Sequence, residues 1–352
     1  MAAIKHAPNF LIPKSGHGTF SKAFSHLLQN SRQNQQLRLI MPKYLPKTLW
    51  NDETLHLPTQ LSNSHMGFLI KKGWQANYQP SSAGGIGGSS HAEAQDHVTN
   101  RFLNSAARMQ FVCTDPRKEH QEVREMVLEQ MASGQIFLLD VASGNGAGTL
   151  AILTLISELR QHQIIPKLPL NINIWGLDIS PDALNFYTEL LDEVSPWLQS
   201  CGITAKLDLH VCNLKISGEI DEILDGFFSE AKAHQSRRFL CIISALSGVK
   251  KEGLEAMMDS LKLIAARLSH KSRFSSWLWV EPKVEKTWLG GFADAIGQTL
   301  QQFVQFLKPK ALTSDISGAS ITKQAARSFQ WIDPHNAHLT KSCVAVMQFK
   351  NL

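Results

Sequence analysis

The sequence lacks an apolar stretch long enough to span a membrane. Its longest apolar runs, such as LAILTLI, fall far short of the roughly 20 residues that a spanning helix needs. It also lacks an N-terminal segment with a basic start, an apolar core and a small-residue cleavage site, so we do not expect secretion. The apolar share of 43% is ordinary for a folded globular protein. We therefore expect a cytoplasmic protein without membrane contact.

Cysteine is scarce and unpaired. The chain has five cysteines in 352 residues, without a CxxC pair or the Cys/His spacing of a zinc site. We expect no disulfide framework and no metal, and a reducing compartment. The odd count leaves a reactive thiol as an alternative. Cys212 and Cys241, however, lie in apolar, strand-like runs where a buried small side chain is the usual role.

Acidic residues are absent before Asp52. Residues 1–80 hold nine Lys and Arg against two acids, a net charge of +7, and the whole chain has +5, so residues 81–352 carry −2. A basic excess confined to one region predicts an acidic partner, and we predict RNA or another nucleic acid. A solvated basic arm and a mitochondrial transit peptide are the alternatives, although only two arginines precede residue 50. A protein partner is a further alternative.

The composition changes at QPSSAGGIGGSSH, residues 79–91, which is too rich in Gly and Ser to lie inside a helix or strand. We therefore divide the chain into three parts. They are a basic, irregular N-terminal extension (1–80), a Gly/Ser-rich linker (81–91) and a folded domain (92–352).

Within the domain, apolar runs alternate with segments of helical spacing. The expected strands are 136–141, 172–178, 207–212, 239–243 and 276–281, and the expected helices between them are 147–162, 181–200, 219–233 and 252–269. This alternation predicts an α/β fold with a doubly wound, mostly parallel seven-stranded sheet. The last segments, SFQWID and CVAVMQF, are joined without a helical pattern and predict an antiparallel final pair.

A glycine loop joins the first strand to its helix in FLLDVASGNGAGTLAIL, residues 137–153. A dinucleotide-binding loop reads G-x-G-x-x-G, but here Gly144 and Gly146 are followed by Thr149. Asp140, at the end of the strand, would also be poorly placed beside a pyrophosphate. These features favour a ligand with a cationic or hydrogen-bond-donating group over NAD.

The stretch LLDVASGNGAG resembles the first motif of the class I S-adenosylmethionine-dependent methyltransferases, which is an apolar strand, an acid and a G-x-G-x-G loop. Ala142 stands where that family most often has its first glycine, and Gly148 supplies a later one. The resemblance implies S-adenosylmethionine as cofactor. The contacts that it implies, with the acid at the amino end of the cofactor, are Asp140, Ser143, Gly144 and Gly146.

Two later elements extend the resemblance. The strand in IWGLDIS ends at Asp178, which the resemblance assigns to the ribose diol. Its spacing from the glycines is longer than the usual ~20 residues, which is explained if RQHQIIPKLPLN is a loop insertion. A helix cap is the alternative role for Asp178. HVCNL places Asn213 after the third strand, where the family has an acid or an amide against the adenine amino group. The resemblance covers residues 136–282 and the closing strands, and it does not reach residues 1–90.

Methyl transfer depends mainly on alignment, sometimes with a base. The fourth strand lacks the Asn/Asp-Pro-Pro-aromatic motif of nucleic-acid amino-methyltransferases, and no Pro-Cys or Thr-Cys nucleophile is present. Ser244 and Ser247 are the polar candidates there, or they cap the turn. Glu281 is our candidate base or orienting acid, and Lys283 a candidate substrate contact. Alternatively, Glu281 and Lys283 are only a pair of charged residues on the rim of the substrate site.

Ahead of the loop, His97, Arg101, Asn104 and Arg108 are spaced to share one helix face. Such a face predicts that Arg101 and Arg108 contact the substrate, with a solvated helix surface as the alternative.

Three functions remain open from the sequence. The first is a methyltransferase acting on RNA or another nucleic acid through residues 1–80. The second is a methyltransferase of a protein or small metabolite, with residues 1–90 as a lid. The third, which Ala142 and the missing amine motif favour, is a non-catalytic assembly or regulatory subunit of the same fold.

Overall fold

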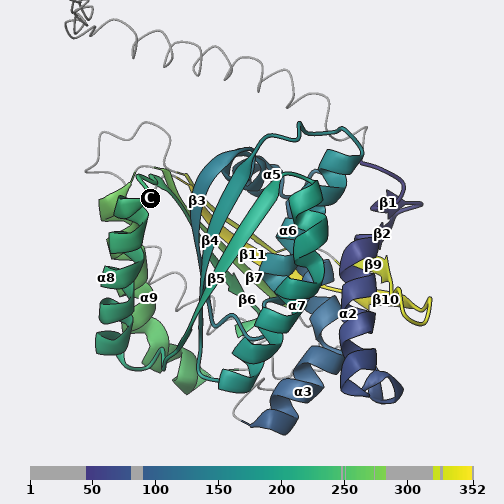
Figure 1. Cartoon of the computed structure of the whole chain (residues 1–352), viewed down its shortest axis with the longest axis horizontal. Coiled ribbons are helices and arrows are strands. Elements are labelled where there is room, and N and C mark those ends of the chain that lie inside the picture. Colours follow the sequence, from purple (N-terminus) through teal and green to yellow (C-terminus); the bar gives the residue numbers. More distant parts are fainter. Residues whose placement is uncertain are drawn as a thin grey trace, which may run out of the picture. The chain divides into compact units, whose positions relative to one another are not determined.

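The structure is a computed structural model that describes residues 45–80, 90–246, 249, 251–272, 274–282, 320–325 and 328–350 (Figure 1). Residues Leu45–Leu352 form one compact unit. Residues 1–44, most of the expected Gly/Ser linker, Ser247 and Lys283 lie outside the described residues.

The core of the fold is a seven-stranded sheet with the order β5-β4-β3-β6-β7-β11-β8. Strands β3 to β7 are parallel to one another, and β11 is antiparallel to both β7 and β8. The strands are β3 (Gly134–Val141), β4 (Leu170–Asp178), β5 (Ile203–Val211), β6 (Arg238–Ser244), β7 (Phe274–Pro282), β8 (Ser320–Ala325) and β11 (Val344–Lys350). The predicted sheet and its antiparallel last strand are confirmed.

Alternate residues of the strands face two separate cores. Ile136 and Leu138 of β3 pack with α6 (Ala147–Gln161) and α7 (Pro181–Ser200), whereas Phe137 and Leu139 pack with α8 (Ser217–Ala233) and α9 (Lys251–Lys271). Figure 1 shows α8 and α9 on one side of the sheet and α6 and α7 on the other. These four helices match the predicted ones to within two residues, and Ser180 caps α7 by accepting a hydrogen bond from Ala183 N.

A second, smaller sheet joins residues from both ends of the described chain. Its order is β1-β2-β9-β10, and β2 pairs in parallel with β9. The strands are β1 (Trp50–Asn51), β2 (Thr54–His56), β9 (Phe329–Ile332) and β10 (Leu339–Ser342).

This small sheet corrects two predictions. Residues 45–80 belong to the same compact unit as the large sheet, so an irregular extension reaching residue 80 is wrong for them. The segment SFQWID forms β9, which pairs with β10 and β2, so its predicted pairing with the last strand is also wrong. Alternation of apolar residues predicts a strand but not which edge it joins.

The helical stretch before the first strand is broken. It forms α3 (His91–Asn100) and α4 (Phe102–Thr114), followed by α5 (Gln121–Gln130), and Arg101 at the break has φ −126°. The Nε2 atom of His65 lies 2.8 Å from the carbonyl oxygen of Val98, which the amide of Phe102 would bond in a continuous helix. The face predicted to carry His97, Arg101, Asn104 and Arg108 is therefore divided between two helices.

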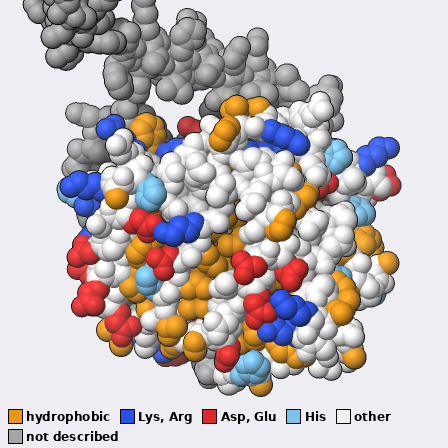
Figure 2. Space-filling model, viewed as in Figure 1, with side chains coloured by type: hydrophobic (Ala, Val, Ile, Leu, Met, Phe, Trp, Pro, Cys, Tyr) orange, Lys and Arg blue, Asp and Glu red, His pale blue; other side chains and the backbone are white. Residues whose placement is uncertain are grey.

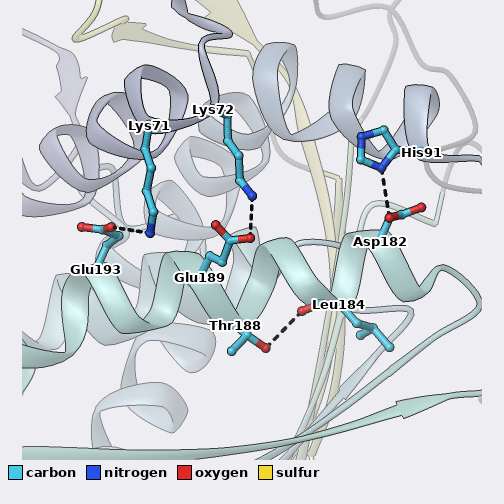
Figure 3. A network of polar contacts seen from close by, with 8 residues as sticks. All are labelled: Lys71, Lys72, His91, Asp182, Leu184, Thr188, Glu189 and Glu193. Atoms are coloured by element: carbon cyan, nitrogen blue, oxygen red, sulfur yellow. Dashed lines mark hydrogen bonds and ion pairs between the residues drawn. The ribbon is translucent and has the colours of Figure 1, made fainter.

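Helix α2 (Thr59–Lys72) packs against α7. Figure 3 shows the polar contacts at this boundary, where Lys72 pairs with Glu189 at 2.7 Å and Lys71 with Glu193 at 3.6 Å. His91 at the start of α3 lies 3.0 Å from Asp182. Partly exposed pairs of this kind contribute little stability, about 0–1 kcal/mol each. Their consequence is that two lysines of the N-terminal basic excess are already paired.

Candidate functional site

The glycine loop runs from the end of β3 to the start of α6. Ala142, Gly144 and Gly146 have φ of 53°, 52° and 74°, so three of its five residues take the left-handed conformation. A Cβ at Gly146 would lie 2.1 Å from the Tyr187 ring. The helix that follows has no side-chain cap, so its first amide groups point into the loop without an intrahelical partner.

Asp178 ends β4 and holds this loop. Its Oδ2 accepts a hydrogen bond from Gly144 N at 2.8 Å, and its Oδ1 accepts one from Ser180 N at 2.9 Å. Burial raises the pKa of the Asp178 carboxyl, against the opposing effect of these backbone donors. The cap of α7 is Ser180, so the alternative of Asp178 as the helix cap is wrong.

Asp140 lies beneath the loop, only 2% exposed. Its Oδ2 accepts hydrogen bonds from Thr149 Oγ1 at 2.6 Å and from Tyr187 Oη at 3.2 Å. Burial raises the pKa of Asp140 to about 7, and the nearby charge of Asp178 adds to this. The described contacts of Asp140 are therefore with α6 and α7, and its predicted contact with a cofactor stays a prediction.

The pKa of Asp140 predicts a pH-dependent stability. The folded state binds this proton more tightly than the unfolded chain, in which the pKa of Asp140 is near 3.8. The stabilisation that the proton gives is therefore fully present below pH 3.8 and is lost as the pH rises through 7. Between these limits it falls by about 1.4 kcal/mol per pH unit. In denaturant titrations from pH 5 to 8, Asp140→Asn should lack this component. Identical pH slopes for variant and parent would contradict it.

Ala142 occupies backbone space that glycine prefers. A left-handed conformation costs an L residue about 1–2 kcal/mol, partly offset by the greater entropy that glycine loses on folding. Ala142→Gly should therefore raise the free energy of unfolding by about 0.5–1 kcal/mol, as measured by chemical denaturation. Ala151→Gly, the same change inside α6, should lower it by at least about 1 kcal/mol. A destabilised Ala142→Gly would show that the methyl group packs usefully.

The neighbouring strand β5 ends beside Asp178, since Val211 is paired with it in register. Asn213 follows, and its Oδ1 accepts a hydrogen bond from Lys215 N at 3.0 Å while its own N–H donates to Glu219. Two large apolar side chains flank Asp178 and are unusually exposed, Ile179 at 57% and Val211 at 60%. This end of the sheet therefore presents an exposed apolar surface beside a carboxylate.

On the other side of β3, Ser244 at the end of β6 lies close to Gly148. A Cβ at Gly148 would be 3.0 Å from Ser244 Cβ and 3.1 Å from Met109 Cε of α4. Ser244 therefore lies beside the first turn of α6, and its predicted catalytic role stays a prediction.

Glu281 lies near the end of β7 and Arg108 in the middle of α4, and both are buried. Glu281 Oε1 accepts hydrogen bonds from Leu246 N at 2.7 Å and from Trp279 Nε1 at 2.6 Å. Arg108 donates to Asn104 Oδ1, and burial lowers its pKa to about 10, against the opposing charge of Glu281. A solvated helix surface is therefore wrong for Arg108, and a role for Glu281 as base stays a prediction.

Arg101 is not part of this group in the structure. It is half-buried at the break between α3 and α4, and it donates to Asp96 Oδ2 at 2.9 Å. Cys212 and Cys241 are buried, as predicted, and burial raises the pKa of both thiols. Within the described ranges no group of three His, Cys, Asp or Glu could hold a metal ion. None of the described helices is long and apolar enough to cross a membrane.

No family model matches this chain, and no curated protein does. Among solved structures it is similar to the trans-methyltransferase CalH in complex with SAH, at 12% identity, with 92% of each chain covered and a TM-score of 0.34. It is also similar to a putative class I S-adenosylmethionine-dependent methyltransferase from Listeria monocytogenes (11% identity, 83% of this chain and 79% of that chain, TM-score 0.34). A third is a precorrin-6y C5,15-methyltransferase from Geobacter metallireducens (12%, 65% and 87%, TM-score 0.32). Similarities at this level do not establish a family.

Two features of the site were missed from the sequence. Tyr187 packs against Gly146, and its hydroxyl donates a hydrogen bond to Asp140. The available signal was a tyrosine on the apolar face of a helix, because a buried tyrosine hydroxyl usually has a hydrogen-bond partner. Asn145, 1% exposed, contacts His97 of α3 through its Nδ2 atom, 2.9 Å from His97 Nδ1. No local pattern indicates that contact, since the two residues are 48 positions apart.

Proposed function

We propose that this chain is an S-adenosylmethionine-dependent methyltransferase. The observation that carries the proposal is the hydrogen bond from Gly144 N to Asp178 Oδ2. It joins the glycine loop after β3 to the acid at the end of β4, the two elements in which the sequence resembles the class I enzymes. Both lie at the carboxyl ends of the strands, beside the point where the strand order reverses between β3 and β6, which is where open α/β sheets bind ligands.

The surroundings of the loop favour this cofactor over NAD. Asp140 places a carboxyl group beneath the loop, and its ionised form would be unfavourable for a pyrophosphate there. The position of the third glycine of a dinucleotide loop is held by Thr149, which is fully buried and donates to Asp140. Substituting glycine there would therefore remove a contact that the fold uses.

The residues present fit an adenosyl ligand with a polar amino-acid end. The Asp178 carboxylate would accept from the ribose hydroxyls, and Ile179 and Val211 would cover the base. Ser143 Oγ and Asn145 Oδ1 are buried and have no hydrogen-bond partner among the described residues, so they are free for the polar end. When bound, the cofactor supplies an electrophilic methyl group on a sulfonium. The task of the protein is to align the acceptor and to exclude water.

For the substrate we propose RNA or another nucleic acid, bound through the basic N-terminal region. On the face drawn in Figure 2, Lys and Arg side chains are interspersed with Asp and Glu over the described part of the chain. Lys71 and Lys72 are paired with acids of α7. The available basic excess therefore lies in residues 1–44, which contain six Lys and Arg and no acid.

Removing residues 1–44 tests this proposal, since residues 45–80 belong to the compact unit and must stay. The full chain should bind a single-stranded RNA with an affinity that falls steeply with salt, and the truncated chain should lose most of that slope. Binding is measured by fluorescence anisotropy from 50 to 300 mM salt. Unchanged affinity after truncation would remove the support for a nucleic-acid substrate.

A small polar substrate is the second candidate, and one contact favours it. Ser342 Oγ of β10 donates to Asn104 Oδ1 at 2.7 Å, which joins the small sheet to α4 beside the buried Arg108. Helix α4 also contacts β7 and β11, so this junction would hinder a large substrate from reaching these strands. Transfer of a labelled methyl group to RNA, protein or a metabolite extract distinguishes the candidates. Cofactor binding without transfer to any of them indicates the non-catalytic subunit.

A further inference from the structure

A row of three histidines connects the small sheet to the glycine loop. His335, after β9, has its Nε2 atom 2.8 Å from Nδ1 of His65 in α2, and the two rings stack. Nε2 of His65 lies 2.8 Å from the Val98 carbonyl oxygen. Because a carbonyl only accepts, His65 carries its proton on Nε2, and its Nδ1 accepts from His335.

The residue before Val98 makes the next contact. His97 Nδ1 lies 2.9 Å from Nδ2 of Asn145, between Gly144 and Gly146. An amide nitrogen only donates, so His97 accepts through an unprotonated Nδ1. Burial lowers the pKa of His97 to about 4, helped by the charges of Arg101 and Arg108, so the neutral ring is the form present near neutrality.

The loop needs such support. Three of its five residues have positive φ, and the helix after it has no side-chain cap. Asp178 holds the loop on one side through Gly144 N. His97 holds it on the other side through Asn145, while His65 fixes the end of α3 by bonding Val98 and stacking on Phe102 at 4.9 Å.

We propose that His97 is a positioning residue for the glycine loop, and that the His335–His65 pair keeps α3 in the place from which His97 reaches Asn145. The segment before the first strand thereby completes the cofactor site. The proposal rests on the proposed function only for the cofactor readout, because loop order is measurable without any ligand.

A matched pair of variants at His97 tests the contact in the full-length protein. His97→Phe keeps a ring of similar size but removes the acceptor, and His97→Asn places an acceptor oxygen near the position of Nδ1. The readouts are amide hydrogen exchange of residues 143–150 without ligand, and affinity for S-adenosylmethionine. His97→Phe should exchange roughly tenfold faster and bind roughly tenfold more weakly, the effect of one hydrogen bond, with His97→Asn close to the parent.

The distant link is tested at half-buried His335, where substitution is better tolerated. His335→Leu should accelerate exchange of the same loop, and His335→Gln, which keeps a donor, should not. His338→Leu, an exposed site on the same hairpin, is the control and should match the parent. Parent-like exchange in both His97→Phe and His335→Leu overturns the proposal, as does equal acceleration in His97→Phe and His97→Asn. If the parent fails to bind the cofactor, the proposed function fails, and the exchange data alone decide this inference.

Discussion

Asp178→Ala should reduce the affinity for S-adenosylmethionine by at least roughly 100-fold. The proposed function assigns this carboxylate to the ribose hydroxyls, and charged hydrogen bonds contribute about 1.5–3 kcal/mol each. The change also leaves the amides of Gly144 and Ser180 without their acceptor. The free energy of unfolding should therefore fall by about 1–3 kcal/mol. Titration calorimetry and chemical denaturation give the two quantities.

Asp182→Ala is the matched control for this variant. Asp182 lies in the first turn of α7 and contacts His91 at the surface, and no hydrogen bond of the described residues joins it to the glycine loop. Its loss should leave cofactor affinity unchanged and stability within about 0.5 kcal/mol of the parent. Parent-like binding by Asp178→Ala would show that this carboxylate does not hold the ribose.

Gly146→Ala should be the most destabilising of the single methyl additions in the loop. The new Cβ would lie 2.1 Å from Tyr187 Cε2, and φ is 74°. Tyr187 is fully buried and bonded to Asp140, so its ring has no room to move aside. We expect a loss of about 3 kcal/mol or more, from overpacking and backbone strain together, and no detectable cofactor binding.

Gly67→Ala is the control of opposite sign. Gly67 lies in α2, and an added Cβ there meets nothing within 4 Å. The substitution should stabilise the protein by about 0.5–1 kcal/mol, because alanine is the better helix former. If Gly146→Ala unfolded at the same denaturant concentration as the parent, the close packing of Tyr187 on the loop would be contradicted.

The elements that follow a regular pattern were predictable from the sequence. Strands β3 and β4 and helices α6 and α7 have uninterrupted apolar periodicity, and their bounds agree with the predicted ones to within two residues. Asp178 and the glycine loop were predictable as neighbours, because the carboxyl ends of adjacent parallel strands meet at one edge of the sheet.

What the sequence did not predict depends on contacts between distant residues. At the break beside Arg101, the Val98 carbonyl is bonded by His65, which lies 33 residues earlier in the sequence. The small sheet pairs β2 with β9, although Thr54 and Gln330 lie at opposite ends of the described chain. Neither pairing leaves a local pattern, since each partner is typical of its own segment.

The most direct test of the central claim is calorimetric titration of the full chain with S-adenosylmethionine, S-adenosylhomocysteine and NAD. The proposed function predicts micromolar binding of both sulfur ligands at one site per chain and no binding of NAD. Binding of NAD with no binding of the sulfur ligands would contradict it.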